Sequence, residues 1–324
     1  MSGDARAFWL ASPGRGEIRP ERVPAPARDE VQVRTLHTGV SRGTETLVFT
    51  GRVPPSQWPH MRAPFQEGDF PAPVKYGYLN VGVVEGGPAD LVGRTVFSLY
   101  PHQTRFNVPA GAVTVVPDDL PAHRAVLAGT VETAVNALWD AAPLLGDRIA
   151  IVGAGMVGAA VAAIAATIPG VRVQLVDIDA SRAALAGTLG VEFALPEAAL
   201  GDCDIVVHAS ATSAGLTRSL ELLATEGTVV ELSWYGDKQV SVPLGEFFHS
   251  RRLTVRSSQV GGIAAGRRRT YGERLALALD LLRNPAFEAL VTGRSNFDEL
   301  PEVMPRLAAG SLPALCHLID YPEE

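Results

Sequence analysis

The chain has 324 residues, of which 47% are hydrophobic and 19% are charged. This length suits one large domain or two ordinary ones, and the composition is too apolar for a disordered chain. The formal net charge of −7 argues against a nucleic-acid partner held by phosphate contacts. Two cysteines, far apart in the sequence, support neither a disulfide framework nor a four-cysteine zinc lobe.

The N-terminal residues do not resemble a secretory signal, because Met1 leads into no long apolar run with a small-residue cleavage site. The alanine-rich stretch near residues 159–166 is apolar but too short to span a bilayer. We therefore expect a cytoplasmic protein without a membrane partner.

Residues 1–118 are predicted to form short strands and turns. "DEVQVRTLHTGV" (29–40) alternates β-branched and polar positions, which favours a strand with one buried face. "LNVGVVEGG" (79–87) and "GRTVFSLY" (93–100) are further predicted strands bounded by glycines. Prolines recur throughout the segment and oppose long helices. The pattern indicates a β-rich, barrel-like domain.

Beyond Pro121 the pattern changes to helical spacing and then to an alternation of strands and helices. The predicted strands are 148–155, 171–179, 203–210, 227–233 and 253–260, and the predicted helices include 122–142, 156–168, 180–190 and 271–283. Such alternation favours a doubly wound parallel sheet covered on both faces. The last forty or so residues do not extend the alternation and are expected to pack on the first domain. The fold class is α/β, with predicted domains 1–120 and 121–285 and a returning segment 286–324.

"IVGAGMVGAAV" (151–161) carries Gly153, Gly155 and Gly158 in the G-x-G-x-x-G spacing between a predicted strand and a predicted helix. In this motif the first glycine allows a tight turn, the second lets the backbone approach a pyrophosphate, and the third lets the helix pack on the strand. The helix N-terminus then offers free N–H groups to the phosphates. The sequence therefore predicts a dinucleotide site.

Asp177 ends the next predicted strand, at about the distance expected for an acid that binds the ribose hydroxyls. A carboxylate there would repel a 2′-phosphate, so NAD is favoured. Arg182 follows one helical turn later and can stack on adenine or meet a phosphate, so NADP stays possible. The alternative interpretation is a glycine turn with a capping aspartate.

A β-rich first domain, a nucleotide-binding second domain and a returning C-terminus resemble the medium-chain dehydrogenase/reductase superfamily over essentially the whole chain. The local matches are "GVSRGTE" (39–45), "KYGYLNVGVVEGG" (75–87), "ETAVNALWDA" (132–141), "IVGAGMVG" (151–158) and "SWYG" (233–236). Together with "FHSRRL" (248–253) and "SSQVGG" (257–262), several of these are similar to the bacteriochlorophyllide a dehydrogenase branch, which oxidises a hydroxyethyl side chain to acetyl. The resemblance implies a GroES-like catalytic domain, a Rossmann domain and a homodimer.

The zinc-type members of this superfamily carry ligands that the chain lacks. A "CGTD"-like stretch is replaced by Ser41 and Arg42 before "GTE", and "GHE" is replaced by Gly77, Tyr78 and Leu79. The third ligand position falls near Gly129 or Thr130. Hydroxyl and aliphatic side chains do not hold zinc as thiolate and imidazole do, so we predict that no catalytic zinc is bound.

Without zinc, side chains must protonate or stabilise the substrate oxygen. Tyr78 stands where a zinc-binding histidine would lie, and Lys75 is a candidate cation that would lower its pKa. In an extended segment Tyr76 would point the opposite way, so at most one of the two tyrosines would reach the substrate. The alternative for Tyr78 is a packed ring at a strand start.

Further candidates follow from the resemblance. Thr44 and Glu45 match the proton-relay neighbourhood, and Thr133 matches a position near the nicotinamide. Glu132 is either a second acid–base group or a helix N-terminal carboxylate. The predicted catalytic residues are Tyr78, Lys75, Ser41, Thr44, Glu45 and Glu132, and the predicted cofactor-binding residues are Gly153, Gly155, Met156, Val157, Gly158, Asp177, Ile178, Arg182, Thr133, Ser210, Ser233 and Trp234.

The histidines are scattered and are mostly interpreted as structural, although His102 lies in a loop-like "YPHQTRF" that can line a pocket. The favoured hypothesis is a zinc-independent NAD(P)-dependent enzyme that interconverts a secondary alcohol and a ketone. A reductase of activated C=C bonds and a catalytically inactive NAD(H)-binding protein are the alternatives. The substrate is a small molecule, and Trp234 with Tyr235 would suit a bulky or cyclic one.

Overall fold

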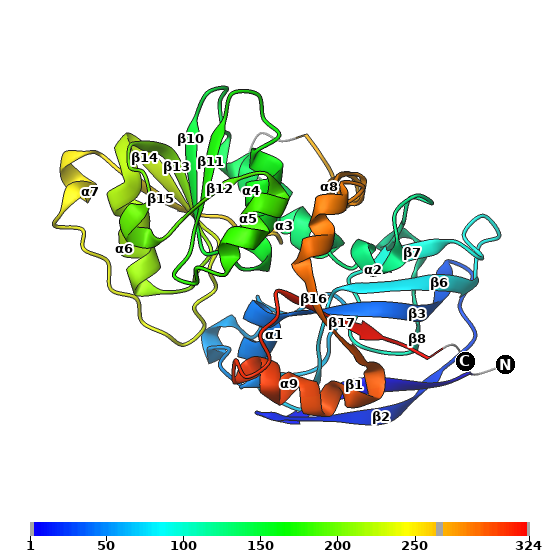
Figure 1. The fold of residues 1–324 in the computed structure, drawn as a ribbon. Helices are drawn as coiled ribbons and strands as arrows, with labels where there is room; N and C mark the ends of the chain where they lie inside the picture. Colours follow the sequence, from blue (N-terminus) through cyan, green and yellow to red (C-terminus); the bar gives the residue numbers. More distant parts are fainter. Residues whose placement is uncertain (1–2, 264–267, 323–324) are drawn as a thin grey trace. The chain divides into compact units, whose positions relative to one another are not determined.

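The computed structural model describes residues 3–263 and 268–322. Its contacts divide the chain into two compact units. Unit 1 comprises residues 1–129, 279–283 and 291–324, and unit 2 comprises residues 130–278 and 284–290. Each unit has its own sheets (Figure 1). Each also has its own cluster of buried hydrophobic residues.

Unit 1 is built on two sheets. The four-stranded sheet has the order β2 (Arg15–Val23), β1 (Gly3–Ser12), β5 (Val74–Lys75) and β4 (Glu67–Gly68). The seven-stranded sheet has the order β16 (Val291–Asn296), β17 (Cys316–Asp320), β3 (Glu30–Ser41), β6 (Asn80–Gly86), β7 (Thr95–Ser98) and β9 (Val113–Val115), and β8 (Arg105–Pro109) also pairs with β3. The C-terminal strand β17 thus pairs antiparallel with β3, although some 280 residues separate Asp320 from its partner His37.

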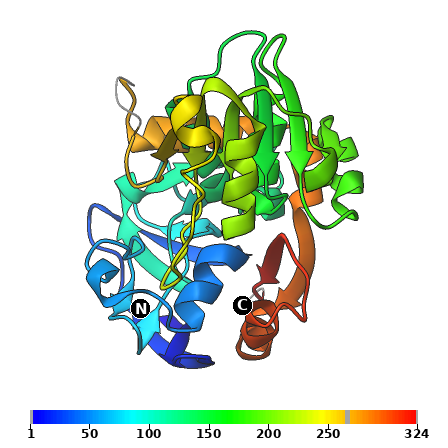
Figure 2. The same ribbon diagram turned by 90° about the vertical axis from the view of Figure 1, so that its left-hand side faces the viewer.

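The predicted alternation is confirmed in the first half of β3. Val31 and Val33 belong to a cluster with Val84, Val96 and Phe106, while Gln32 between them is half-exposed. The pairing register shifts between Thr35 and His37, and residues 38–41 are all buried. Three helices complete the unit: α1 (Arg42–Phe49), α2 (Ala122–Ala125) and α9 (Leu300–Ala308). Helices α1 and α9 contact each other (Figures 1 and 2).

The helix α1 is absent from the sequence-based prediction. Gly43, Thr44 and Thr46 lower its helix propensity, and it follows β3 without a turn signal. Burial of Val48 and Phe49 stabilises it instead, which is a tertiary effect that local propensity does not show.

Unit 2 holds a parallel sheet, as predicted, with six strands, of which β12 (Glu192–Ala194) is absent from the sequence-based prediction. Its order is β12, β11 (Arg172–Val176), β10 (Arg148–Val152), β13 (Cys203–His208), β14 (Leu223–Glu231) and β15 (Thr254–Ser257). The strand order reverses between β10 and β13. Right-handed crossovers therefore put α4 (Met156–Ala165) and α5 (Arg182–Leu189) on one face and α6 (Ser213–Leu222) on the other (Figure 1).

The remaining helices are α3 (Ala128–Ala141), α7 (Phe247–Ser250) and α8 (Tyr271–Leu281), and short 3-10 turns lie at Pro55–Gln57, Ala110–Ala112, Pro196–Ala198, Pro285–Leu290 and Phe297–Glu299. The helix predicted over residues 122–142 is divided into α2 and α3, because the Leu127 N–H bonds to the Arg124 carbonyl in a tighter i→i−3 turn. Within the described residues, no helix is both long and apolar enough to cross a membrane.

Candidate active site

The glycine turn between β10 and α4 is dictated by close backbone contacts. Gly153 has a φ of +111°, and a Cβ added to it would lie 2.7 Å from the Ser210 nitrogen. A Cβ on Gly158 would lie 2.0 Å from the Gly153 carbonyl oxygen. Neither position therefore accepts a side chain, which leaves the turn tight and α4 close to the sheet.

Gly155 plays a different part in the same turn. It is the N-cap of α4, and a Cβ added to it meets no heavy atom within 4 Å. The turn is therefore open on this side. Since glycine has no capping side chain, the first N–H groups of α4, at Met156 and Val157, are suited to receive an anion such as a pyrophosphate.

Asp177 directly follows β11 and faces the glycine turn. Its Oδ2 accepts a hydrogen bond from the Ala154 N–H at 2.6 Å, and its Oδ1 accepts one from the Asp179 N–H at 2.9 Å. The carboxylate thus fixes the turn, as in the capping interpretation, and each oxygen keeps a second lone pair for a ligand. Arg182 pairs with Asp179 at 3.3 Å.

Ile178 stands beside Asp177 with 86% of its surface exposed. It lies at the carboxyl edge of the parallel sheet, which is where doubly wound sheets bind ligands. An exposed isoleucine at this edge offers an apolar surface to a flat ring such as adenine.

A polar cluster occupies the carboxyl ends of β13 and β14. His208 Nδ1 lies 2.7 Å from Glu231 Oε2, and His208 Nε2 lies 2.7 Å from Ser210 Oγ. The Tyr235 hydroxyl donates to Glu231 Oε2 at 2.9 Å, and Ser233 Oγ accepts from the Ala211 N–H at 3.1 Å. The structure therefore brings together the predicted Ser210 and Ser233, while Trp234 lies half-buried next to them in sequence.

In unit 1 the centre of the candidate site is Glu45, which is only 3% exposed. Its Oε1 accepts from the N–H of Ser41, the N-cap residue of α1, at 2.7 Å, and its Oε2 lies 2.8 Å from His102 Nε2. The other imidazole nitrogen, Nδ1, lies 2.7 Å from the Thr38 hydroxyl. That hydroxyl lies 3.2 Å from the hydroxyl of Tyr321.

Tyr78 belongs to the same neighbourhood. Its side chain is hydrogen-bonded to the side chains of Ser41 and Thr44. Burial and the negative charge of Glu45 raise its pKa to about 12, against the lowering effect of the two hydroxyls. The phenol therefore carries its proton throughout the physiological pH range.

The residues around Gly77 are arranged differently from the sequence-based prediction. Gly77 has a φ of +135°, so residues 76–79 are not a continuous extended strand. The rings of Tyr76 and Tyr78 do not point in opposite directions but meet edge to face, with centroids 6.0 Å apart. A Cβ at Gly77 would lie 2.9 Å from His102 Cδ2, so only glycine lets the backbone approach the imidazole here.

Lys75 does not act on Tyr78 as expected. It is 1% exposed, and its ammonium contacts Gln103 Oε1 at 2.6 Å and Glu67 Oε1 at 2.5 Å. It also lies over the ring of Trp9 at 5.7 Å. The prediction that a neighbouring cation lowers the pKa of Tyr78 is therefore wrong, because this cation is bound elsewhere and the pKa is raised.

Glu132 is placed inside unit 2, in the body of α3. Its Oε1 accepts from Arg274 Nε of α8 at 3.0 Å, and both side chains are almost fully buried. Burial raises the pKa of Glu132, and Arg274 opposes that shift. Glu132 is thus not a helix N-terminal carboxylate. Thr133 follows it in α3.

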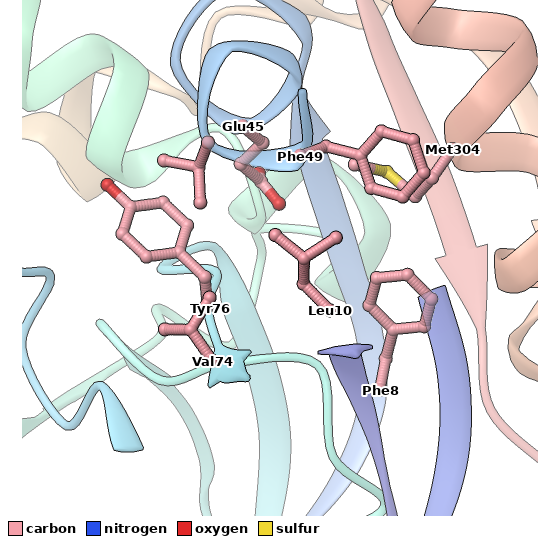
Figure 3. A pocket seen from close by; sticks show the side chains of 8 residues that line it. Phe8, Leu10, Glu45, Phe49, Val74, Tyr76 and Met304 are labelled. Carbon is pink, nitrogen blue, oxygen red and sulfur yellow. The ribbon is translucent and has the colours of Figure 1, made fainter. Parts of the chain in front are cut away.

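A pocket in unit 1 borders the Glu45 carboxylate. It is lined by Phe8, Leu10, Glu45, Val48, Phe49, Val74, Tyr76 and Met304 (Figure 3). Apart from Glu45 and the Tyr76 hydroxyl, this lining is apolar.

The positions that would hold zinc in the resemblance carry hydroxyls and no thiolate. Ser41 and Tyr78 share a hydrogen bond, and the Thr130 hydroxyl donates to the sulfur of Met156 at 3.4 Å. Both imidazole nitrogens of His102 already have partners. In the described parts of the chain, His, Cys, Asp and Glu form no group of three that could hold a metal ion.

The sequence pattern favours a structural role for His102 and His208, yet each contacts a carboxylate. Each lies far in sequence from its carboxylate partner, at a separation of 57 positions for His102 and Glu45 and of 23 positions for His208 and Glu231. The one local signal was the loop-like "YPHQTRF" around His102, since it placed a histidine outside a regular strand.

No protein-family profile matches the chain. A zinc-type alcohol dehydrogenase-like protein of Haemophilus influenzae, itself uncharacterized, is 28% identical over 214 residues. This match covers 62% of the chain and 59% of that relative, which is less than two thirds of the relative's length.

Solved structures match along nearly the whole chain. A zinc-binding dehydrogenase candidate of Sinorhizobium meliloti 1021, bound to NADP, has 18% identity and a TM-score of 0.77, with 98% of this chain and 99% of that chain covered. An alcohol dehydrogenase of Escherichia coli CFT073, complexed with NADH, has 16% identity and a TM-score of 0.78, with the same coverage of 98% and 99%. The chain therefore has the fold of the NAD(P)-dependent medium-chain dehydrogenases.

Proposed function

We propose that this chain is an NAD(P)-dependent oxidoreductase that interconverts a secondary alcohol and a ketone, and that side chains of unit 1 replace zinc. The observation that carries the proposal is the bonding of Tyr78. Its hydroxyl is protonated at neutral pH and lies in a set of hydroxyls with Ser41 and Thr44, beside the buried Glu45–His102 pair.

The residues of unit 2 fit a dinucleotide. The open face at Gly155, the N-terminus of α4, the Asp177 carboxylate and the exposed Ile178 together suit a pyrophosphate, a ribose and an adenine. NADP and NADH are bound in the two structurally similar proteins. We favour NAD, since the Asp177 carboxylate would repel a 2′-phosphate and Arg182 is paired with Asp179.

The donor set in unit 1 does not suit zinc. Zinc sites are built from thiolates, imidazoles and carboxylates, whereas Ser41 and Tyr78 provide hydroxyls. The mechanism therefore assigns no step to a metal ion.

A nicotinamide dinucleotide held by these residues of unit 2 would supply the hydride transfer to or from the substrate carbon. In the direction of ketone reduction, the Tyr78 hydroxyl donates a hydrogen bond to the substrate oxygen and gives it a proton as negative charge develops there. The Ser41 and Thr44 hydroxyls donate hydrogen bonds that stabilise the phenolate. A proton taken up from solvent then restores the phenol, and each hydroxyl can pass on one proton only as it receives another. In the direction of alcohol oxidation the same protons move in reverse.

Glu45 and His102 hold this arrangement in place. One carboxylate oxygen accepts from the Ser41 N–H and the other faces the imidazole, which fixes the start of α1 with the hydroxyls of Ser41 and Thr44. A buried carboxylate without such partners would be costly.

Titration of the purified protein with NADH and NADPH, followed by fluorescence, tests the cofactor. Turnover of secondary alcohols with NAD, compared with reduction of enones by NADH, then tests the reaction. Turnover should survive dialysis against a zinc chelator. Loss of activity on chelation with recovery on adding zinc would overturn the zinc-independent mechanism, and binding of neither nucleotide would overturn the enzyme assignment.

We also propose that the chain belongs to the bacteriochlorophyllide a dehydrogenase branch and that its substrate is bulky and cyclic. Trp234 and Tyr235, which follow β14 at the carboxyl edge of the sheet, support a flat substrate. Turnover of a hydroxyethyl-substituted macrocycle, against a small secondary alcohol as comparison, would test this choice.

A further inference from the structure

Four buried polar side chains of unit 1 form a continuous line of hydrogen bonds that ends at Glu45. Tyr321, directly after β17, lies with its hydroxyl 3.2 Å from Thr38 Oγ1. Thr38 Oγ1 lies 2.7 Å from His102 Nδ1, and His102 Nε2 lies 2.8 Å from Glu45 Oε2. Each of the four residues is 8% exposed or less. The mechanism proposed above involves His102 and Glu45 but leaves Thr38 and Tyr321 without a role.

Tyr321 is held in place by contacts that do not involve its hydroxyl. Its backbone N–H donates to the Leu36 carbonyl at 3.1 Å, and its ring stacks on that of Phe297 with the centroids 4.7 Å apart. Burial raises the pKa of Tyr321, so the hydroxyl keeps its proton and needs an acceptor. The hydroxyl faces Thr38 Oγ1. The Tyr321 hydroxyl therefore donates to Thr38.

This donation sets the direction of the other hydrogen bonds. A threonine hydroxyl carries one proton, and since the Thr38 oxygen accepts from Tyr321, that proton is directed to His102 Nδ1. Nδ1 then accepts, which places the imidazole proton on Nε2, where it is donated to Glu45 Oε2. With the proton on Nδ1 instead, the imidazole would donate to Thr38. Either the Thr38 or the Tyr321 proton would then be buried without an acceptor, at a cost in free energy.

The position of the imidazole proton bears on the proposed proton donor. With the proton on Nε2, the imidazole binds the Glu45 carboxylate. With the proton on Nδ1, a ring lone pair would face a carboxylate oxygen, and the two acceptors would repel each other. The other oxygen of Glu45 accepts from the Ser41 N–H at 2.7 Å, and the Ser41 side chain is hydrogen-bonded to Tyr78. A displaced Glu45 would therefore disturb the surroundings of the Tyr78 hydroxyl.

We propose that Tyr321 and Thr38 are positioning residues of the proposed reaction, which hold the His102 proton on Nε2 and thereby keep Glu45 and Tyr78 in place. The kinetic part of this inference rests on the function proposed above. The tautomer of His102 does not rest on it, because it follows from the hydrogen bonds alone. The returning C-terminal segment thus contributes a hydroxyl to the site, although Thr38 and Tyr321 are separated by 283 positions.

Long-range 1H–15N NMR of the histidine rings tests the tautomer directly, since protonated and unprotonated ring nitrogens resonate in separate 15N ranges. The His102 signals are identified by comparison with His102→Gln. At about pH 8, above the range in which histidines ordinarily titrate, the wild-type chain should carry the His102 proton on Nε2. Tyr321→Phe keeps the ring that stacks on Phe297 and removes the hydroxyl, so it should show both tautomers.

Steady-state kinetics with NAD and a secondary alcohol that the wild-type chain oxidises test the positioning role. Tyr321→Phe should lower kcat about 2–10-fold, the range of one hydrogen bond, with both KM values unchanged. Thr38→Val should lower kcat at least as much, and Thr38→Ser, which keeps the hydroxyl, should retain most of the activity. Adding Tyr321→Phe to Thr38→Val should lower kcat no further, because Tyr321 acts through Thr38.

Tyr100→Phe is the matched control, because Tyr100 is also a buried tyrosine of unit 1 and its ring stacks on Phe106. This variant should keep the wild-type kcat and the wild-type tautomer of His102.

A wild-type His102 with its proton on Nδ1, or an unchanged tautomer in Tyr321→Phe, would overturn the proposal whether or not the chain is an enzyme. Independent, multiplicative losses of kcat in the double variant would assign Tyr321 a packing role and overturn it as well. If Thr38→Val does not fold, the tautomer in Tyr321→Phe decides. A wild-type chain that turns over no alcohol or ketone would overturn the proposed function and the kinetic role, while the NMR result would still decide the direction of the hydrogen bonds.

Discussion

At the scale of single residues, the hydroxyl of Tyr78 is the group most directly open to test. Tyr78→Phe removes the proposed proton donor and keeps the ring that packs edge to face on Tyr76. We expect turnover to fall by about 10²–10⁴-fold, the usual contribution of a general acid, with NADH affinity unchanged. Tyr76→Phe is the matched control and should retain most of its activity. Near-normal turnover in Tyr78→Phe would remove the tyrosine from the mechanism.

The charge of Glu45 gives a second residue-scale prediction. Burial and this charge raise the pKa of Tyr78 to about 12, so Glu45→Gln should lower that pKa while the amide still meets Ser41 and His102. The alkaline onset of phenolate formation, and of any loss of ketone reduction that follows it, should move to lower pH. Tyrosinate absorbance, taken as the difference from the corresponding Tyr78→Phe proteins, measures this shift. An unchanged or higher pKa would contradict the assigned electrostatic effect.

These residues also show how far sequence reasoning reaches. The tyrosine, Ser41, Thr44 and Glu45 were predicted because a resemblance aligned them with known positions, and the structure brings all four together. His102 lies 57 positions after Glu45, and the two meet because β3, the strand that leads into α1, is bonded to the His102 loop through Thr35 and Thr38. Lys75 is predicted to lie beside Tyr78 because the two are close in sequence. Its side chain instead places the ammonium against Glu67 and Gln103.

At the scale of elements, α3 and α8 are joined by the buried Glu132–Arg274 pair. Arg274 also bonds to Asn136 Oδ1 and to the Val260 carbonyl, at 2.5 Å each. Arg274→Met would leave Glu132 buried without its cation, and we expect a loss of about 3–5 kcal/mol in the free energy of unfolding. Arg148→Met, in a half-exposed pair with Asp204, should cost at most about 1 kcal/mol. Denaturant unfolding measures both, and equal losses would argue against the anchoring role.

The helices and strands differ in how well the local sequence pattern predicts them. The parallel strands β10, β11 and β13 are largely buried, so each shows a mainly apolar run between turn signals, and β14 shows such a run in its second half. The helix α1 shows no such signal, because its stability comes from contacts with α9 and from the buried side chains Val48 and Phe49. Local sequence pattern therefore predicts the parallel sheet of unit 2 but does not predict α1, the helix that carries Thr44 and Glu45.

At the scale of the whole molecule, β15 is the edge through which we expect two copies to associate. All four of its residues are exposed, and Val255, at 41%, is among the exposed large apolar side chains. β14 pairs with only one side of β15, so the other side offers backbone groups to a second strand. A two-fold axis would pair β15 with itself and extend the sheet.

Multi-angle light scattering after gel filtration tests this association. The wild-type protein should have about twice the mass of the 34.2 kDa chain. Val255→Lys places a charge on the edge strand, where like charges from two copies would face each other, and it should shift the protein to monomer. Leu144→Lys, on an exposed loop residue, is the control and should remain dimeric. A wild-type monomer, or a Val255→Lys dimer as stable as the wild type, would exclude β15 as the interface.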